Sequence, residues 1–186
     1  LRRDGARAGD VVWVSGELGG SRLGLRYLKA GGSPVFAGAR AEELEGFVSR
    51  YRSPEPRLDL GLGLAGCASS AMDVSDGILV DGGRLALASG VSLALEVERL
   101  PVCDLLRRVY GGDYVKVMEY GSWGDDYELL FTASVSDRDL ILETARVAGV
   151  EVSEIGRVVD RGDAGVILLD GGGCVIRVSD YGWRHF

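Results

Sequence analysis

Two aspartates and a serine stand at the junction of two apolar segments in residues 71–83, AMDVSDGILVDGG. Asp73, Ser75 and Asp76 could cap a helix there, because side-chain oxygens accept hydrogen bonds from the first backbone N–H groups and the helix dipole favours negative charge. The two carboxylates could instead bind Mg²⁺, which takes a few carboxylate oxygens together with water and phosphate oxygens. Capping is the simpler interpretation, but it explains only one carboxylate, so both interpretations stay open.

A second acidic stretch precedes an apolar segment at residues 121–130, GSWGDDYELL. Asp125, Asp126 and Glu128 fit a turn with a solvated acidic edge, which is the simpler interpretation for this stretch alone. The functional interpretation is a set of polar side chains that a rigid strand delivers to a site.

The third candidate stretch is DYGWRHF at residues 180–186. Aromatic residues at a chain end usually dock into the core, which is the simpler role for Trp183. A lone histidine such as His185 is more often packed or hydrogen-bonded than catalytic.

Hydrophobic periodicity divides the chain into short elements. Alternating or β-branched apolar residues predict strands at 10–16, 91–102, 127–135, 153–160, 164–173 and 174–180, the last two as a hairpin. Apolar spacings of three and four residues predict helices at 21–32, 41–53, 78–90 and 137–150. Gly82 and Gly83 indicate close packing of the third of these helices, and the glycine-rich segment 58–70 is compatible with a tightly packed helix. Strands and helices do not alternate strictly, which predicts an α+β domain with a mixed sheet.

Composition narrows the function classes. The 186 residues suffice for one well-packed domain, and a net charge of −7 with scattered basic residues argues against a nucleic-acid binder. The odd number of widely spaced cysteines, Cys67, Cys103 and Cys174, predicts small core residues in a reducing compartment. Neither a membrane-spanning run nor a signal-peptide pattern is present, so we expect a cytoplasmic protein.

The order of the motifs resembles that of the thiamine-monophosphate kinases, within the superfamily of aminoimidazole ribotide synthetase. The pieces that carry the resemblance are RRDGARAGDVVWVSGELGGSRLGL (2–25), PEPR (54–57), AMDVSDGILVD (71–81), LPV (100–102), GDDYELLFT (124–132), IGRV (155–158) and GWRHF (182–186). They cover the chain from end to end. The Asp-x-Ser-Asp-Gly motif is typical of the superfamily, whereas DYELLFT and the terminal aromatic-x-His-Phe are more particular to the thiamine-phosphate branch.

The resemblance implies a mixed, largely antiparallel sheet layered with helices, and phosphoryl transfer from ATP to thiamine monophosphate, giving thiamine diphosphate. In this interpretation Asp73 and Asp76 are Mg²⁺ ligands, and one of them also caps the helix. Ser75 contacts the ATP phosphates, and Arg3 helps to bind ATP. Such a reaction needs metal ions and cations that hold and neutralise phosphates more than it needs covalent chemistry.

Two residues are implied to contact the thiamine substrate. Asp125 falls where the family usually has glutamate, and Trp183 falls at the family's aromatic residue near the C-terminus. An aromatic side chain can cover the cationic thiazolium or the pyrimidine. The chain departs from the family at residues 123–126, WGDD, because Trp123 replaces a small residue and Asp125 has an arm one methylene shorter than glutamate.

Residues 1–186 are expected to form a single domain of the C-terminal type. The family's N-terminal domain, which adds acidic metal ligands and ATP contacts and makes most of a homodimer interface, has no counterpart such as a GDDAA-like segment in this sequence. We therefore expect the chain alone to be inactive.

Two alternatives remain. One is another ATP-dependent, phosphate-activating enzyme of the superfamily, although selenophosphate synthetase needs a reactive Cys or selenocysteine, and the hydrogenase maturation protein a C-terminal Cys where this sequence has Phe186. The other is a non-catalytic binding module that keeps the fold. Retention of Asp73, Ser75 and Asp76 argues against the module, because buried charges need partners.

Overall fold

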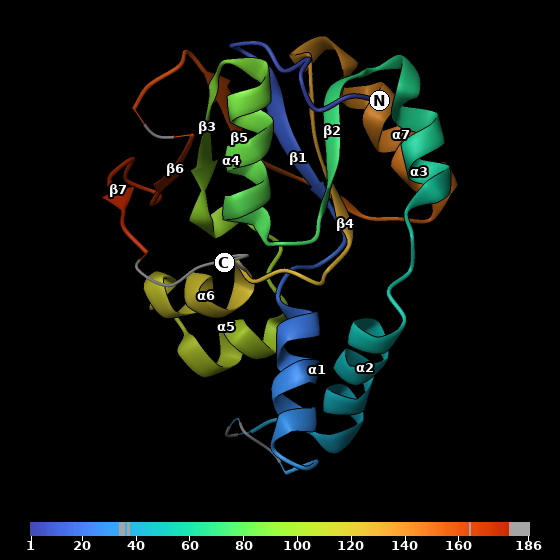
Figure 1. Ribbon diagram of the computed structural model, residues 1–186, viewed down its shortest axis with the longest axis vertical. Helices are drawn as coiled ribbons and strands as arrows, with labels where there is room; N and C mark the ends of the chain where they lie inside the picture. The colour runs from blue at the N-terminus through green and yellow to red at the C-terminus, as the bar shows by residue number, and fades with distance from the viewer. Residues whose placement is uncertain (34–35, 37, 164, 179–186) are drawn as a thin grey trace.

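A seven-stranded sheet organises the computed structural model, which describes residues 1–33, 36, 38–163 and 165–178. Its order is β2-β4-β1-β5-β3-β6-β7, and each neighbouring pair is antiparallel except the parallel pair β3–β6 (Figure 1). The strands are β1 (Val11–Ser15), β2 (Ala68–Val74), β3 (Ser92–Glu96), β4 (Glu128–Ala133), β5 (Val152–Val159), β6 (Val166–Leu169) and β7 (Val175–Ile176). The prediction of an α+β domain with a mixed, largely antiparallel sheet is confirmed.

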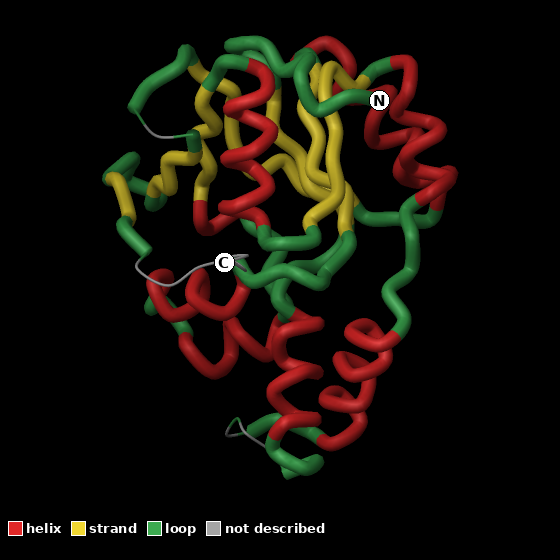
Figure 2. Tube along the Cα trace, viewed as in Figure 1, coloured by secondary structure: helices red, strands yellow, loops and turns green. Residues whose placement is uncertain are grey.

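Helices cover both faces of the sheet, and a second group of helices lies beyond one end of its strands (Figure 2). They are α1 (Gly20–Lys29), α2 (Ala41–Arg52), α3 (Leu58–Gly63), α4 (Ile78–Ser89), α5 (Asp104–Tyr110), α6 (Tyr114–Gly121) and α7 (Arg138–Ala148). Helix α4 packs on one face, α3 and α7 pack on the other, and α1, α2, α5 and α6 lie below the sheet in the view of Figure 1. In the described part of the chain, no helix has both the length and the apolar character needed to cross a membrane.

Strand β1 shows why a continuous apolar run forms a central strand. Val12 and Val14 belong to the core under α4, whereas Val11 and Trp13 belong to the core under α3 and α7. Successive side chains of a strand point to opposite faces, so burial on both faces removes the usual alternation with polar residues. On the second face the Trp13 ring lies parallel to the ring of Phe131, with centroids 6.1 Å apart.

Several predicted elements need correction. Residues 58–70 do not form one helix, because α3 ends at Gly63 and β2 begins at Ala68. Ser70 lowers the β-signal of that strand, but its hydroxyl lies 2.7 Å from the Thr132 hydroxyl of the neighbouring β4, so the polar group is satisfied inside the sheet. Helices α5 and α6 were not predicted, and the strand predicted at 91–102 ends at Glu96.

Three further predictions are only partly correct. Cys67 and Cys103 are buried as expected, but Cys174 is exposed. Gly82 does pack closely, since an added Cβ would lie 3.2 Å from Val166, whereas a Cβ at Gly83 would meet nothing within 4 Å. The predicted C-terminal hairpin is present as β6–β7, while residues 179–180 of its second strand lie outside the described residues.

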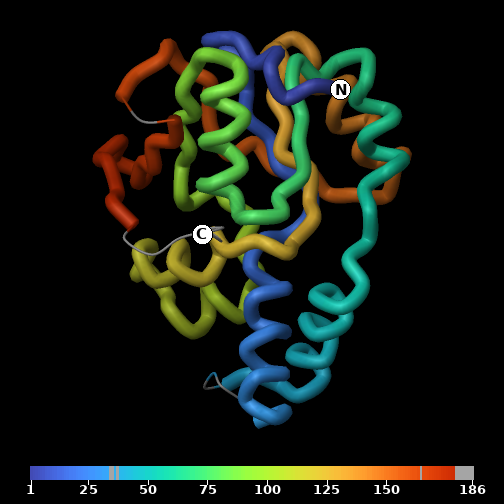
Figure 3. The backbone as a smooth tube through the Cα atoms, in the orientation of Figure 1, coloured from blue at the N-terminus to red at the C-terminus, as the bar shows by residue number. Residues whose placement is uncertain are grey.

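The pairing of β2 with β4 brings the two acidic stretches together. Val74 is opposite Glu128, so β2 ends where β4 begins, and the end of β1 lies at the same edge (Figure 3). The loops that continue these strands touch directly. A Cβ on Gly77 would lie 1.9 Å from the Ser122 carbonyl oxygen, and one on Gly124 would lie 2.0 Å from the Ser75 carbonyl oxygen.

Gly77→Ala should lower the free energy of unfolding by about 2 kcal/mol or more, because Gly77 has φ +113° and no room for a Cβ. Chemical denaturation would measure the change. The control is Gly83→Ala, inside α4, which should be neutral or stabilise by up to about 1 kcal/mol. Equal effects of the two changes would contradict the tight contact between the loops.

Candidate functional site

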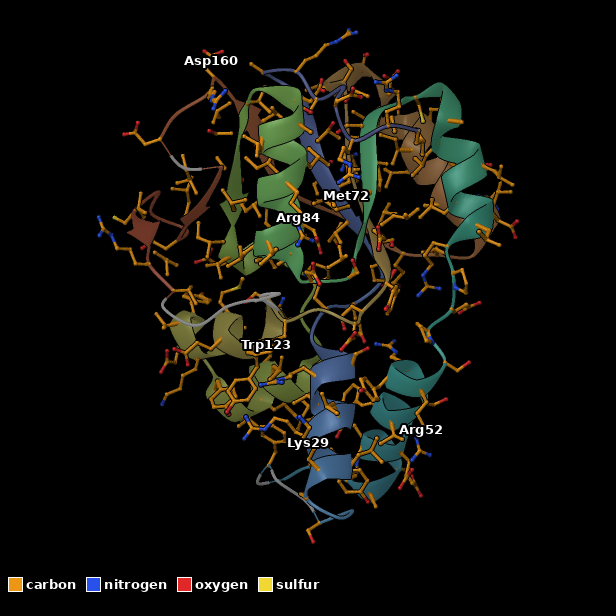
Figure 4. The ribbon with its side chains drawn as sticks, in the orientation of Figure 1. Lys29, Arg52, Met72, Arg84, Trp123 and Asp160 are labelled. Atoms are coloured by element: carbon orange, nitrogen blue, oxygen red, sulfur yellow. The ribbon has the colours of Figure 1, made fainter. Side chains whose placement is uncertain are left out.

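A cleft of about 640 Å³ lies at the edge where β2 ends and β4 begins. Its lining combines cations, carboxylates and aromatic rings from α1, α2 and the two loops: Arg22, Leu25, Lys29, Tyr51, Ser75, Asp76, Trp123, Gly124, Asp125 and Tyr127. Figure 4 labels Lys29 and Trp123 in this region. A mostly preformed concave site with a few charged groups suits a small, partly apolar, charged ligand.

The loop that carries Asp125 has a strained backbone. Asp125 and Tyr127 have φ values of 68° and 52°, the only positive values among the described non-glycine residues. Their N–H groups donate to the carbonyl oxygens of Ser75 and Val74, both at 2.9 Å. Non-glycine residues in this region cost energy and persist where the surroundings fix them, which is common at functional sites. Burial raises the pKa of Asp125, the nearby Asp76 adds to this effect, and Arg22 opposes it.

Asp126 holds the start of helix α1. Its carboxylate accepts hydrogen bonds from the N–H groups of Gly19 at 2.8 Å and Ser21 at 3.3 Å. It therefore supplies the cap that α1 lacks locally, because the N-cap residue Gly19 has no side chain. Burial raises the pKa of Asp126 to about 7, although both backbone donors act in the opposite direction.

Glu128 forms a buried ion pair behind the cleft. Arg57 binds its carboxylate through two nitrogens, each at 2.8 Å, and the Ser15 hydroxyl donates to it at 2.6 Å. The Glu128 side chain is only 6% exposed, so Arg57 compensates a carboxylate that has almost no contact with water. The Ser15 hydroxyl also accepts from the Leu129 N–H at 2.8 Å, which ties β1 to β4 at the edge of the site.

The N-cap of α4 is Gly77, so the prediction that Asp73 or Asp76 caps this helix is wrong, and Asp81 in the first turn binds the backbone just before the helix. Asp81 is fully buried and accepts from the N–H groups of Asp76 and Gly77 at 2.8 and 3.0 Å. Asp76 instead forms an ion pair with Arg84, which also donates to Asp81 at 2.7 Å. Burial raises the pKa of Asp81, against the lowering effect of these donors.

The predicted site residues are divided between two hollows. Ser75, Asp76 and Asp125 line the cleft described above. Arg3 and Asp73 line a shallower groove of about 680 Å³, where the N-terminal residues run beside β2 and Met72 (Figure 4). Trp183 and His185 lie outside the described residues.

The described residues offer a partial fit to Mg²⁺. Asp73 has an exposed carboxylate, whereas the carboxylate of Asp76 is engaged by Arg84. Among the residues that the structure describes, no three His, Cys, Asp or Glu side chains come together as a metal cluster. Mg²⁺ commonly binds through one or two carboxylates, while water and phosphate oxygens complete its coordination shell. These aspartates therefore suit a site in which a phosphate ligand supplies part of the shell better than a site made of protein ligands alone.

Several residues of the site were not recognised from the sequence. Arg22 and Lys29 were counted among scattered basic residues, although a spacing of seven places them on one face of a helix. Arg57 follows a Pro-x-Pro break, and its partner Glu128 lies 71 residues later, so no local pattern links them. Asp81 could have been recognised by its position in the first turn of the predicted helix.

The chain is thus a layered α+β domain with a charged cleft at the ends of two strands. Residues 7–169 match the family described as AIR synthase related protein, C-terminal domain. The chain belongs to this family.

The similar proteins include enzymes named thiamine-monophosphate kinase. The one from Aquifex aeolicus is 35% identical over 99% of this chain and 54% of its own length, and the one from Caulobacter vibrioides is 34% identical over 100% and 50%. The chain thus spans about half the length of these relatives.

Solved structures of similar proteins share the fold of this chain. A thiamine-monophosphate kinase from Stenotrophomonas maltophilia K279a has a TM-score of 0.78 and 37% identity over 90% of this chain and 52% of its own. A structure described as AaThiL complexed with AMPPCP and TMP has a TM-score of 0.72 and 33% identity over 99% and 53%. The hydrogenase maturation protein HypE of E. coli, at 19% identity and a TM-score of 0.69 over 98% and 53%, shares the fold.

Arg57→Ala should lower the free energy of unfolding by about 2 to 4 kcal/mol, because it leaves Glu128 buried without its cation. Urea denaturation would measure the loss. The matched control is Arg146→Ala, which breaks an exposed pair with Glu143 and should change stability little. A loss no larger than that of the control would contradict the role of Arg57.

Asp126→Asn tests the buried carboxylate through pH. Because the pKa of Asp126 rises from 3.8 to about 7 on folding, the wild-type protein should lose stability relative to the variant as pH increases from about 4 to 7. The slope should be at most about 1.4 kcal/mol per pH unit, and the difference should level off above pH 7. Denaturation curves at four pH values would measure it, with Asp113→Asn at the exposed cap of α6 as the control for loss of one charge. A difference that is constant from pH 4 to 7 would contradict the raised pKa.

Proposed function

We propose that this chain is the C-terminal half of an ATP-dependent kinase that phosphorylates thiamine monophosphate to thiamine diphosphate. The observation that carries the proposal is the similarity of the whole chain, at 30 to 35% identity, to enzymes named thiamine-monophosphate kinase. One similar structure holds AMPPCP, an analogue of ATP, together with TMP, which fits a site for two phosphate-bearing ligands.

The described residues supply the polar walls of such a site. Ser75 lies in the tight turn between β2 and α4 and lines the cleft, where a hydroxyl side chain suits contact with an ATP phosphate. Arg3 lies in the neighbouring groove and suits the same anionic co-substrate from the other side. The two hollows adjoin the same strand, because Asp73 is the second-last residue of β2 and Ser75 follows its last residue, Val74.

Mg²⁺, when bound, would neutralise the phosphate oxygens during transfer. Asp73 and Asp76 are the proposed protein ligands, and Asp76 would exchange its contact with Arg84 for the metal. Since two carboxylates do not complete the shell, the remaining ligands are proposed to come from phosphate oxygens, water and the other half of the enzyme.

Asp125 is the proposed contact to the thiamine substrate, and Trp183 is proposed to stack on it. Asp125 lines the cleft on a backbone that its neighbours hold in place, so its carboxylate has a defined position despite the arm shorter than that of glutamate. A rigidly placed polar group is what substrate positioning requires, because misplacement by about 1 Å can cost a hundredfold in rate.

The complete enzyme is proposed to be a cytoplasmic homodimer that adds an N-terminal domain to this chain. The relatives are about twice as long as the part that they share with this chain, which supports a missing half. Both hollows are open to solvent on one side in the described chain, which agrees with a site that another domain completes.

Mg·ATP-dependent phosphorylation of thiamine monophosphate should occur in the protein that carries this chain with its upstream half, and not in residues 1–186 alone. Asp73→Asn should reduce kcat by at least about a hundredfold through loss of a metal ligand. Production of thiamine diphosphate, followed by chromatography, would measure both effects.

The matched control is Asp160→Asn, an exposed aspartate at the opposite edge of the sheet, which should leave the rate unchanged (Figure 4). A longer protein that binds ATP but never phosphorylates thiamine monophosphate would overturn the proposal. It would then favour another phosphate-activating enzyme of this fold, whereas absence of ATP binding would favour a binding module.

A further inference from the structure

Arg22 and Trp123 form a stacked pair inside the cleft. The guanidinium carbon of Arg22, on α1, lies 3.6 Å from the centroid of the Trp123 ring, on the loop before β4. Both side chains also line the cleft. Stacking fixes a side chain that would otherwise sample many rotamers, so the cation has a defined place before any ligand arrives.

The described walls of the cleft carry charges of both signs, and α1 supplies two of the cations. Arg22 and Lys29 contribute two cations from one face of α1, against the carboxylates of Asp76 and Asp125. Arg84 pairs with Asp76 and also with the buried Asp81, so it is shared between two carboxylates. Arg22 and Lys29 bring two cations from α1 to one wall of the cleft, close to Asp125.

Stacking on an aromatic ring and binding a phosphate use different parts of a guanidinium. The ring contacts the flat face of Arg22, whereas the N–H donors lie in its plane and can bind two oxygens of one phosphate. A phosphate monoester with an aromatic or heterocyclic body would also contact the apolar lining, which includes Leu25, Tyr51 and Tyr127.

We propose that Arg22, oriented by Trp123 and assisted by Lys29, binds the phosphate group of the acceptor substrate. The pair thereby makes the cleft select a phosphate monoester over the corresponding unphosphorylated alcohol. Arg22 is the binding residue, and Trp123 acts through it as a positioning residue. The identity of the acceptor rests on the proposed function, while the anion site itself rests on the geometry of the cleft.

Equilibrium binding to the complete protein tests the proposal. Dissociation constants would be measured for thiamine monophosphate, thiamine, AMPPCP and inorganic pyrophosphate. Arg22→Met should weaken binding of thiamine monophosphate by about ten- to a hundredfold, the usual effect of losing hydrogen bonds to a charged group, and leave thiamine within about twofold. Arg22→Lys, which keeps the charge without the fork, should recover only part of the loss.

Two further variants serve as controls. Arg52→Met, at an exposed arginine of α2 outside the cleft lining, should change none of the constants (Figure 4). Trp123→Ala should weaken binding of thiamine monophosphate, and Trp123→Phe, which keeps an aromatic face for Arg22, should restore most of it. Restoration by phenylalanine separates positioning of Arg22 from a general loss of packing, and thermal melts would check that each variant is folded.

Several outcomes would overturn the inference. If Arg22→Met weakened the binding of thiamine and of thiamine monophosphate equally, Arg22 would not bind the phosphate group of the acceptor. If it weakened the binding of AMPPCP alone, Arg22 would belong to the nucleotide site. Arg22-dependent binding of pyrophosphate by a wild-type protein that does not bind thiamine monophosphate would overturn the proposed function and support the anion site. Binding of none of the phosphate compounds would overturn both.

Discussion

The antiparallel pairing of β2 with β4 is the constraint on which the candidate site depends. Its register places Val74 opposite Glu128. The two acidic stretches, about fifty residues apart in sequence, therefore lie side by side where β2 ends and β4 begins. A slip of one residue would turn every side chain of the strand to the opposite face. The backbone contacts of Asp125 and Tyr127 with β2 and its loop continue the same pairing beyond the last ladder position.

The acidic residues around the cleft divide into those that build the site and those that face a ligand. Asp81, Asp126 and Glu128 each satisfy groups that folding would otherwise leave unpaired: the N–H groups at the starts of α4 and α1, and the guanidinium of Arg57. A buried carboxylate is costly unless donors surround it, so these three residues fix the geometry of their neighbours. Asp125 and Asp73 line the hollows instead.

The sequence was informative where periodicity was strong and partners were local. The strand at β1, the helices at α2 and α7, and the antiparallel character implied by the family resemblance agree with the structure. Strand β2 was not predicted, because its serines are satisfied by hydrogen bonds to Thr132 in β4, which lies more than sixty residues away in the sequence. For the same reason the sequence could not show that Arg22 would meet Trp123, or that Asp73 and Asp76 would line separate hollows. The signal in each case is a tertiary contact rather than a spacing.

The position of β1 in the sheet has a consequence for synthesis of the chain on the ribosome. β1 is complete after Ser15, yet the strands on its two sides, β4 and β5, begin only at Glu128 and Val152. During translation, the backbone groups on both sides of this strongly apolar strand therefore stay unpaired until strands more than a hundred residues later are synthesised. Pairing of such distant segments is slow, and unpaired strand edges promote association between chains, so the nascent protein is most exposed to aggregation, and most dependent on chaperones, before β4 appears.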